Sequence, residues 1–148
     1  MFKKTSDPDD WFEVYEIADN LFAFREPRHY ENTIVSLVIG HDKAALIDTG
    51  CGIGNLRRAV EDVTDKPVVV INTHTHPDHI GSNCQFEEIA MFDLPLSRRV
   101  AEQGISHETL VTDILADKRV PGPWPPDFDP HVFSIPPFSI ANRLKRHK

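Results

Sequence analysis

An uninterrupted apolar segment, Val68-Val69-Val70-Ile71, constrains the fold of this chain more than any other feature. Its four residues are all β-branched, and they do not alternate with polar residues as in a strand with one face in water. A strand of this kind is buried on both faces, which happens in a sheet covered by helices. The chain is therefore predicted to contain an α/β sheet in which this segment is an interior strand.

A strand–helix–strand crossover is predicted around this segment. A strand from Ala44 to Asp48 precedes a glycine-rich turn at Gly50–Gly54, and a helix from about Asn55 to Val63 follows. The helix has one apolar stripe at positions i, i+3, i+4 and i+7, formed by Leu56, Ala59, Val60 and Val63. Such a crossover is right-handed in nearly all proteins.

Short strands joined by tight turns are predicted before the crossover, which makes the opening half antiparallel: Val14–Ile17, Leu21–Phe24 and Thr33–Ile39. After it we expect a strand at Ile89–Phe92 and helices at Ser97–Gln103 and Glu108–Lys118. The second helix is expected to bury Leu110, Val111, Ile114 and Leu115. The basic residues at the end of the chain are interpreted as a solvated terminal helix: Arg143, Lys145, Arg146 and Lys148.

The chain is predicted to form one domain over residues 11–148, preceded by a polar, flexible tail over residues 1–10. The segment 121–137 holds seven of the twelve prolines, which excludes regular structure there. A loop of this length often serves as a lid or as a wall of a substrate site. Its apolar anchors are expected to be Trp124, Phe128 and Phe133.

Composition excludes several classes of protein. A formal net charge of −7 argues against a general nucleic-acid-binding role. No segment approaches the ~20 apolar residues that a membrane span requires, and the first residues turn acidic where a signal peptide is apolar. The cysteines, Cys51 and Cys84, are far apart and lack a CxxC pattern, so two free thiols in a reducing cytoplasm are predicted.

Four side chains of the type that binds metals follow the apolar segment within six residues, His74-Thr75-His76-Pro77-Asp78-His79. Imidazole nitrogen and carboxylate oxygen are ligands that zinc prefers. Ligands in open α/β sheets gather at the carboxyl ends of the strands, and this turn lies at such an end. His74 and His76 are two residues apart, so in extended backbone their rings lie on one side. The pattern therefore predicts a metal site.

Other residues are expected around this turn. Asp48 ends the neighbouring strand at the same edge of the sheet, where it either holds a ligand histidine or caps the turn. Ser82 and Asn83 can supply further hydrogen bonds. His29 and Tyr30, in the loop before the third strand, are predicted to lie near the mouth of the site and contact substrate. The alternative for these two residues is an exposed hairpin loop.

The spacing His74-x-His76-x-Asp78-His79 after an apolar strand resembles the signature of the metallo-β-lactamase superfamily, and Leu46-Ile47-Asp48-Thr49-Gly50 resembles the strand and turn that precede the family's first crossover helix. The resemblance implies an αβ/βα sandwich that binds one or two metal ions, usually zinc, with iron or manganese as alternatives. His74 and His76 would bind the first metal, and Asp78 and His79 the second. A hydroxide held by the metals would be the nucleophile, and the catalytic Asp78 would orient it or take its proton.

The same resemblance implies that the chain is incomplete. Family members have a second half that supplies a third histidine, a bridging aspartate and a last histidine, and these motifs are not found after Phe92. His107 and His131 lack the glycine-flanked setting of the third ligand and are assigned to a helix start and a loop. The sandwich is therefore expected to be partial, comprising the N-terminal β-sheet and its flanking helices. Its exposed apolar face implies association with a second copy or with the missing half.

The reaction implied is hydrolysis of an ester, thioester, lactone or amide bond in a small-molecule substrate. An iron-dependent sulfur dioxygenase of the same fold and a non-catalytic metal-binding remnant are the alternatives. Diiron oxidoreductases of this fold carry glutamate where His76 stands, which argues against that branch. A dinucleotide-binding fold requires Gly-x-Gly-x-x-Gly, and the glycine turn here has Asn55 at the last position.

Overall fold

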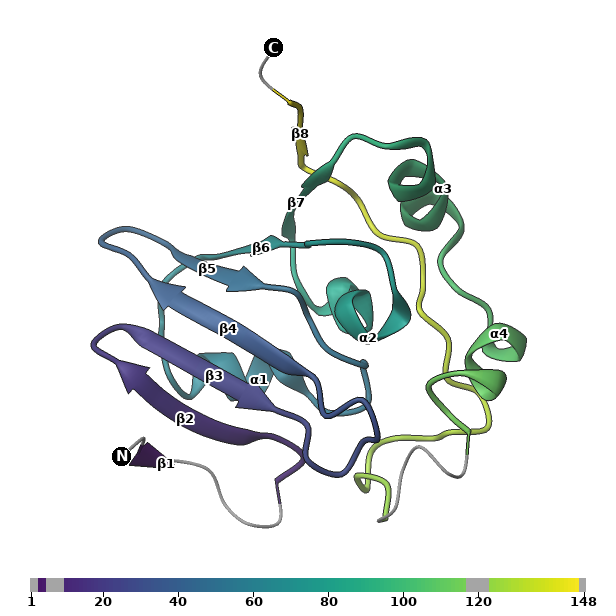
Figure 1. Cartoon of the computed structure of the whole chain (residues 1–148), viewed down its shortest axis with the longest axis horizontal. Coiled ribbons are helices and arrows are strands. Elements are labelled where there is room, and N and C mark those ends of the chain that lie inside the picture. Colours follow the sequence, from purple (N-terminus) through teal and green to yellow (C-terminus); the bar gives the residue numbers. More distant parts are fainter. Residues whose placement is uncertain (1–2, 5–9, 117–122, 147–148) are drawn as a thin grey trace.

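The computed structural model describes residues 3–4, 10–116 and 123–146. This part of the chain forms one mixed sheet of eight strands, which lie side by side in the order of the sequence (Figure 1). Neighbouring strands run antiparallel from β1 to β5 and parallel from β5 to β8. The strands are β1 (Lys3–Lys4), β2 (Glu13–Ala18), β3 (Leu21–Arg25), β4 (Ile34–Ile39), β5 (Ala44–Ile47), β6 (Val68–Ile71), β7 (Glu88–Phe92) and β8 (Asn142–Leu144).

The helices are short, and the first three major ones begin near their predicted positions. The side chain of Asn55 caps the first helix by accepting from the backbone N–H of Arg58, and Pro77 occupies the first turn of the second. The helices are α1 (Leu56–Glu61), α2 (Pro77–Ile80), α3 (Pro95–Gln103), α4 (His107–Thr112) and a 3-10 helix at Asn83–Gln85.

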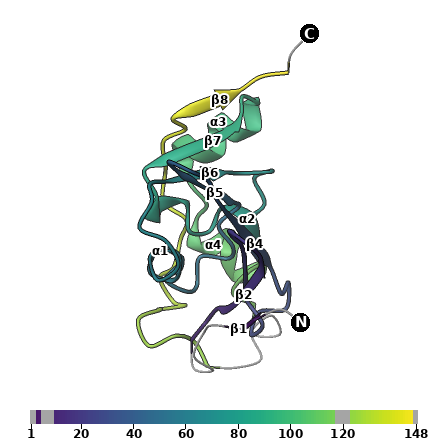
Figure 2. The same ribbon diagram turned by 90° about the vertical axis from the view of Figure 1, so that its left-hand side faces the viewer.

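The core lies between one face of the sheet and α1, which Figures 1 and 2 show lying against that face. Alternate residues of adjacent strands point into it, since Phe24 pairs with Val35 and Leu37 pairs with Leu46. All four of these side chains are 0% exposed, as are Leu56 and Val60 of α1. The α/β prediction is confirmed by this arrangement.

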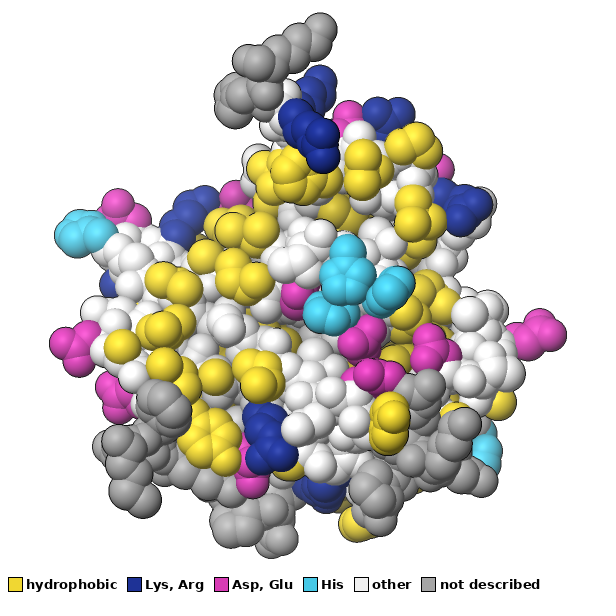
Figure 3. Space-filling view, in the orientation of Figure 1, with side chains coloured by type: hydrophobic (Ala, Val, Ile, Leu, Met, Phe, Trp, Pro, Cys, Tyr) yellow, Lys and Arg dark blue, Asp and Glu magenta, His cyan; other side chains and the backbone are white. Residues whose placement is uncertain are grey.

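The opposite face of the sheet is apolar and open to solvent. Figure 3 shows hydrophobic side chains across it, next to a group of histidines. Ile34 and Val38 of β4 are 57% and 46% exposed. β6 is an interior strand, as predicted, but only Val70 is fully buried, and Val69 and Ile71 are half-buried on the open face. The prediction of burial on both faces was therefore wrong for the described residues.

Other differences from prediction are local. The helix predicted over Glu108–Lys118 ends at Thr112, because a turn then carries Ile114 and Leu115 into the core while Val111 stays 44% exposed. Lys118 lies outside the described residues.

Both ends of the sheet also differ from prediction. The prediction of a terminal helix was wrong, since β8 is an edge strand that pairs with β7. Arg143 of this strand lies 3.8 Å from Asp93. Within the predicted tail, Lys3 and Lys4 form β1 against β2. In contrast, residues 123–137 contain no helix or strand beyond a single bridge between Ile135 and Ile105, and Trp124, Phe128 and Phe133 pack against the core.

Two predictions about the character of the chain can be compared with the structure. Cys51 is buried, Cys84 is exposed, and both thiols are free. Among the described residues, every helix is too short or too polar to cross a membrane.

Candidate metal centre

The four predicted ligands lie at the carboxyl end of β6 and in the first turns that follow it. The ring centroid of His74 lies 4.7 Å from that of His76 and 4.1 Å from that of His79. His79 Nε2 lies 3.2 Å from an oxygen of Asp78. Nevertheless, no set of three or more His, Cys, Asp or Glu side chains in the described part of the chain is disposed to hold a metal ion. The side chains are neighbours, but they do not form a closed cage.

Asp48 connects the end of β5 to this turn. Its carboxylate is 6% exposed and accepts from the backbone N–H of Thr73 at 2.8 Å, from the Thr73 hydroxyl at 2.8 Å and from His79 Nδ1 at 2.9 Å. Its backbone is in the left-handed region, with φ of 63°, which Asp and Asn tolerate better than other non-glycine residues. Asp48 therefore fixes both the start of the turn and the ring of His79.

These hydrogen bonds select the ring tautomers. A carboxylate only accepts, so His79 Nδ1 carries the proton that bonds Asp48, and in the neutral ring Nε2, which lies 3.2 Å from Asp78, keeps the lone pair. The Thr73 hydroxyl gives its proton to Asp48, so at 2.9 Å it accepts from His74 Nδ1. His74 Nε2 is then also a lone-pair donor. Both rings are held in the form that binds a metal through Nε2.

Electrostatics favour neutral imidazole at the centre of the group. Partial burial, together with the neighbouring His79 and His76, lowers the pKa of His74. The neutral form persists to a lower pH than in a free histidine, and it is the neutral form that ligates metals. The donor set therefore fits a divalent cation in chemical type and protonation, although further donors would be needed to close the site.

The backbone beneath this group is tightly interlocked with the glycine turn. The N–H of Thr49 donates to the carbonyl of His79 at 2.9 Å, and the N–H of Gly81 donates to the carbonyl of Gly50 at 2.9 Å. A Cβ on Gly52 would lie 2.5 Å from the carbonyl oxygen of Gly81. The position of α2 is therefore set by direct backbone contact with residues 49–52.

A buried amide pair supports the same turn. Asn72 and Asn83 are 2% and 0% exposed, and their side chains bond each other, while Asn72 also donates to the carbonyl of His79 at 3.1 Å. The Thr49 hydroxyl donates to Asn83 at 2.8 Å. Asn83 thus supplies the predicted hydrogen bonds. The buried hydroxyl of Ser82 has no partner among the described residues.

A buried carboxylate lies behind the glycine turn. Glu26 is 0% exposed and accepts from Trp11 Nε1 at 2.8 Å and from the backbone N–H of Cys51 at 2.9 Å. Burial raises its pKa to about 6, opposed by these two hydrogen bonds, and the charge of Asp78 adds to the rise. The carboxylate is thus near enough to the candidate metal centre for Asp78 to act on it electrostatically.

The remaining predicted residues lie at different depths. His29 is 2% exposed; its Nε2 donates to the carbonyl of Ile114 at 2.9 Å, and its Nδ1 accepts from the N–H of Glu31 at 3.2 Å. Tyr30 is 68% exposed. His107 starts α4 and bonds the carbonyl of Phe133, and His131 is exposed in the proline-rich loop. The substrate contacts assigned to His29 and Tyr30 remain predictions, with only Tyr30 presented to solvent.

Sequence reasoning missed the supporting residues Glu26, Thr49, Asn72 and Thr73. Thr73 and Asn72 adjoin the histidine motif, so their positions offered a signal. Glu26 offered none, because a glutamate at the end of a strand is ordinarily solvated.

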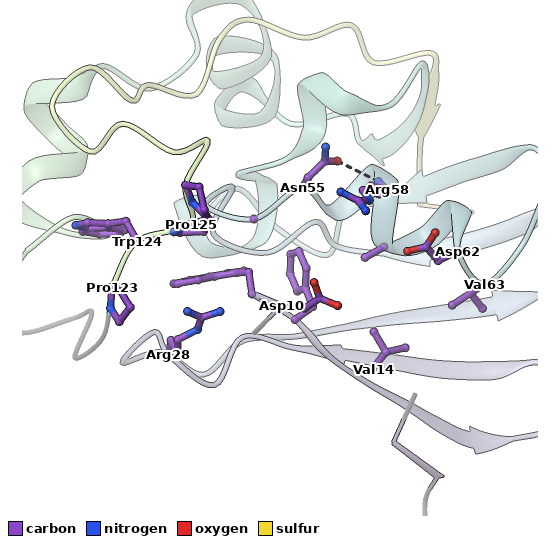
Figure 4. Close-up of a pocket in the computed structure, with 15 residues that line it drawn as sticks. Asp10, Val14, Arg28, Asn55, Arg58, Asp62, Val63, Pro123, Trp124 and Pro125 are labelled. Carbon is purple, nitrogen blue, oxygen red and sulfur yellow. Dashed lines mark hydrogen bonds between the residues drawn. The ribbon is translucent and has the colours of Figure 1, made fainter. Parts of the chain in front are cut away.

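A separate cavity of about 560 Å³ lies on the α1 side of the sheet. Figure 4 shows Trp124, Arg28 and Pro125 on one side of it, and Arg58 of α1 and Asp62, which follows α1, on another. None of the motif histidines lines it, so this cavity is not part of the candidate metal centre.

Comparison with known proteins gives a consistent family. Residues 31–134 match the sequence profile of the metallo-beta-lactamase superfamily. The chain is 31% identical over 97 residues to the human acyl-coenzyme A thioesterase MBLAC2, a match that covers 55% of this chain and 34% of the human protein. It is 27% identical over 148 residues to the Gallus gallus protein of that name, covering 92% of this chain and 52% of the relative. The chain thus spans about half or less of these relatives.

Two solved structures are similar over part of their length. The DIM-1 metallo-beta-lactamase exposed to ceftazidime gives a TM-score of 0.44 at 16% identity, covering 59% of this chain and 45% of that one. A flavo di-iron protein variant from Thermotoga maritima gives a TM-score of 0.40 at 19% identity, covering 68% of this chain and 29% of that one.

Proposed function

The chain belongs to the metallo-beta-lactamase superfamily, and from that premise we propose that it is a metal-dependent hydrolase of thioester bonds. The observation that carries the proposal is the pair of hydrogen-bonded rings: His79 and His74 donate through Nδ1 to Asp48 and Thr73, so that in the neutral rings Nε2 keeps the lone pair that binds a metal. The thioester is supported by the human and Gallus gallus relatives, which are named acyl-coenzyme A thioesterases.

We assign the binding of one or two metal ions, with zinc as the proposed ion, to His74, His76, Asp78 and His79. A bound divalent cation would acidify water and polarise the thioester carbonyl. Asp48 keeps the ring of His79 oriented, and Thr73 keeps that of His74 oriented. The Asp78 carboxylate accepts the proton of the attacking water, because its side chain is 20% exposed and borders the rings. A cytoplasmic location, predicted from the free cysteines, is part of the same proposal.

Metal content and thioester cleavage test this function together. We expect protein purified without added metal and then dialysed to retain zinc by elemental mass spectrometry, and to hydrolyse a soluble acyl thioester. Removing the metal with a chelator should abolish hydrolysis, and adding zinc should restore it. Retained iron with oxygen consumption on a persulfide would instead establish the dioxygenase alternative. Retained metal without hydrolysis would favour the non-catalytic metal-binding alternative, and absence of metal would overturn the proposed metal site.

The open sheet face supports a partner that completes the site, because it adjoins the histidines (Figure 3) and the described donors form no closed cage. We expect a second copy of the chain to cover it, so that sedimentation shows mass rising with protein concentration. Val38→Glu should shift the protein towards monomer, because it places a charge on the exposed apolar face. The matched control is Val111→Glu, which alters an equally exposed valine on α4. A monomer at every concentration would contradict the second copy.

A further inference from the structure

The buried carboxylate of Glu26 forms no ion pair with a cation in the described part of the chain. Glu26 lies just after β3 and is 0% exposed. A buried carboxylate without a cation destabilises a fold unless its hydrogen bonds compensate. A glutamine or an apolar residue would fill this space at a smaller desolvation cost. The position of Glu26 therefore calls for a role beyond packing.

The two oxygens of Glu26 face different parts of the chain. Oε1 accepts from Trp11 Nε1 at 2.8 Å, which ties the carboxylate to the residues before β2. Oε2 accepts from the backbone N–H of Cys51 at 2.9 Å, in the middle of the glycine turn. The turn is pressed against this oxygen, because a Cβ on Gly50 would lie 2.6 Å from Oε2. Oε2 thus fixes the position of the turn itself.

The glycine turn also fixes the end of α2. The Gly50 carbonyl accepts from the N–H of Gly81 at 2.9 Å, and a Cβ at Gly81 would collide with the backbone of Cys51 and Gly52. Backbones in such contact move together. Gly81 follows α2, the helix that carries Asp78 and His79. Two hydrogen bonds, the close backbone packing at Gly81 and the short helix α2 thus join Glu26 to two of the proposed metal ligands.

We propose that Glu26 is a positioning residue for the metal centre, acting through the Cys51 turn to hold α2 and its ligands Asp78 and His79 in place. This inference rests on the proposed function, since it requires those residues to bind a metal. The two hydrogen bonds of the Glu26 carboxylate then have different roles. The bond to Cys51 supports metal binding, whereas the bond to Trp11 supports only the fold.

The test uses Glu26→Gln in the whole chain, with Trp11→Phe as the matched control. Glutamine has the same shape as glutamate. It has only one acceptor oxygen for the two donors, Trp11 Nε1 and the N–H of Cys51, and its NH₂ group then faces one of them. We expect zinc affinity, measured by competition with a chelator, to fall about tenfold, the lower end for groups that support a ligand. The visible spectrum of the Co²⁺-loaded variant should also change. Trp11→Phe should lower the melting temperature of the metal-free protein but leave zinc affinity and the Co²⁺ spectrum unchanged.

Each outcome separates the two hypotheses. If the unaltered chain binds neither zinc nor Co²⁺, the proposed metal site is wrong and Glu26 has nothing to position. If the unaltered chain binds both metals and Glu26→Gln binds them equally well, only the positioning role is overturned. The positioning role is also overturned if Trp11→Phe lowers zinc affinity as much as Glu26→Gln does. If Glu26→Gln does not fold, the positioning role can be tested by hydrogen exchange of the backbone amides in the unaltered chain, with and without zinc. Zinc is expected to slow exchange at Cys51 and Gly81 together, and slowing at Gly81 alone overturns the proposal.

Discussion

Replacing His76 with alanine is expected to lower zinc affinity more than about 100-fold, because the loss of a ligand should exceed the 10–100-fold loss seen when a supporting group is removed. Thioester hydrolysis should fall to background in the same variant. The fold should survive, since His76 is exposed and its side chain makes no cap hydrogen bond to α2. Zinc competition and a thioester assay on the same preparation measure both effects.

His41→Ala is the matched control for this substitution. The side chain of His41 is 96% exposed and bonds its neighbour Asp42, so its loss removes a histidine that lies outside the turn. Equal zinc binding by both variants would contradict the assignment of His76. Weaker binding in both would point to general association of zinc with surface histidines.

The second large effect is expected at Asp48. Asp48→Asn should lower zinc affinity about 10–100-fold, because asparagine offers one acceptor oxygen and its NH₂ group opposes the protonated Nδ1 of His79. Asparagine tolerates the left-handed backbone at this position, with φ of 63°, so the turn itself should persist. The loss should therefore appear in zinc competition while the far-ultraviolet circular dichroism stays unchanged.

Asp42→Asn provides the control for the loss of a carboxylate. Asp42 is in an exposed hairpin and its side chain is 87% exposed. Its substitution changes the net charge by the same amount as Asp48→Asn. A decrease in zinc affinity that both variants share would therefore report long-range attraction of the cation. An Asp48→Asn protein with undiminished affinity would show that the ring of His79 needs no orientation from β5.

The elements of the sheet could be predicted because their signals are local. β-branched residues and turn residues located β2 to β7, and the histidine motif placed four potential ligands on one turn. The end of α4 could not be predicted, since Ile114 and Leu115 fit a helical stripe equally well and only packing turns them inward. β8 was missed because its pairing with Phe92 spans some fifty intervening residues.

The support of the metal centre was less predictable than its candidate ligands. Asp48 was found because it ends a strand at the same edge of the sheet. Glu26 and Asn72 act through contacts with residues distant in sequence, such as Cys51 and Asn83, and only the folded chain brings them together. Residue type and spacing therefore predicted which potential ligands gather at this turn, while the groups that support the turn could be found only in the structure.

The strand order has a consequence for how the chain folds. From β1 to β5 each strand pairs with its predecessor through a short connection, so this part can form from contacts that lie close in the sequence. The bonds of Asp48 to Thr73 and His79 span 25 and 31 residues and require the α1 crossover to close first. We therefore expect the antiparallel half to form before the histidine turn, which needs the β5–α1–β6 crossover to be in place.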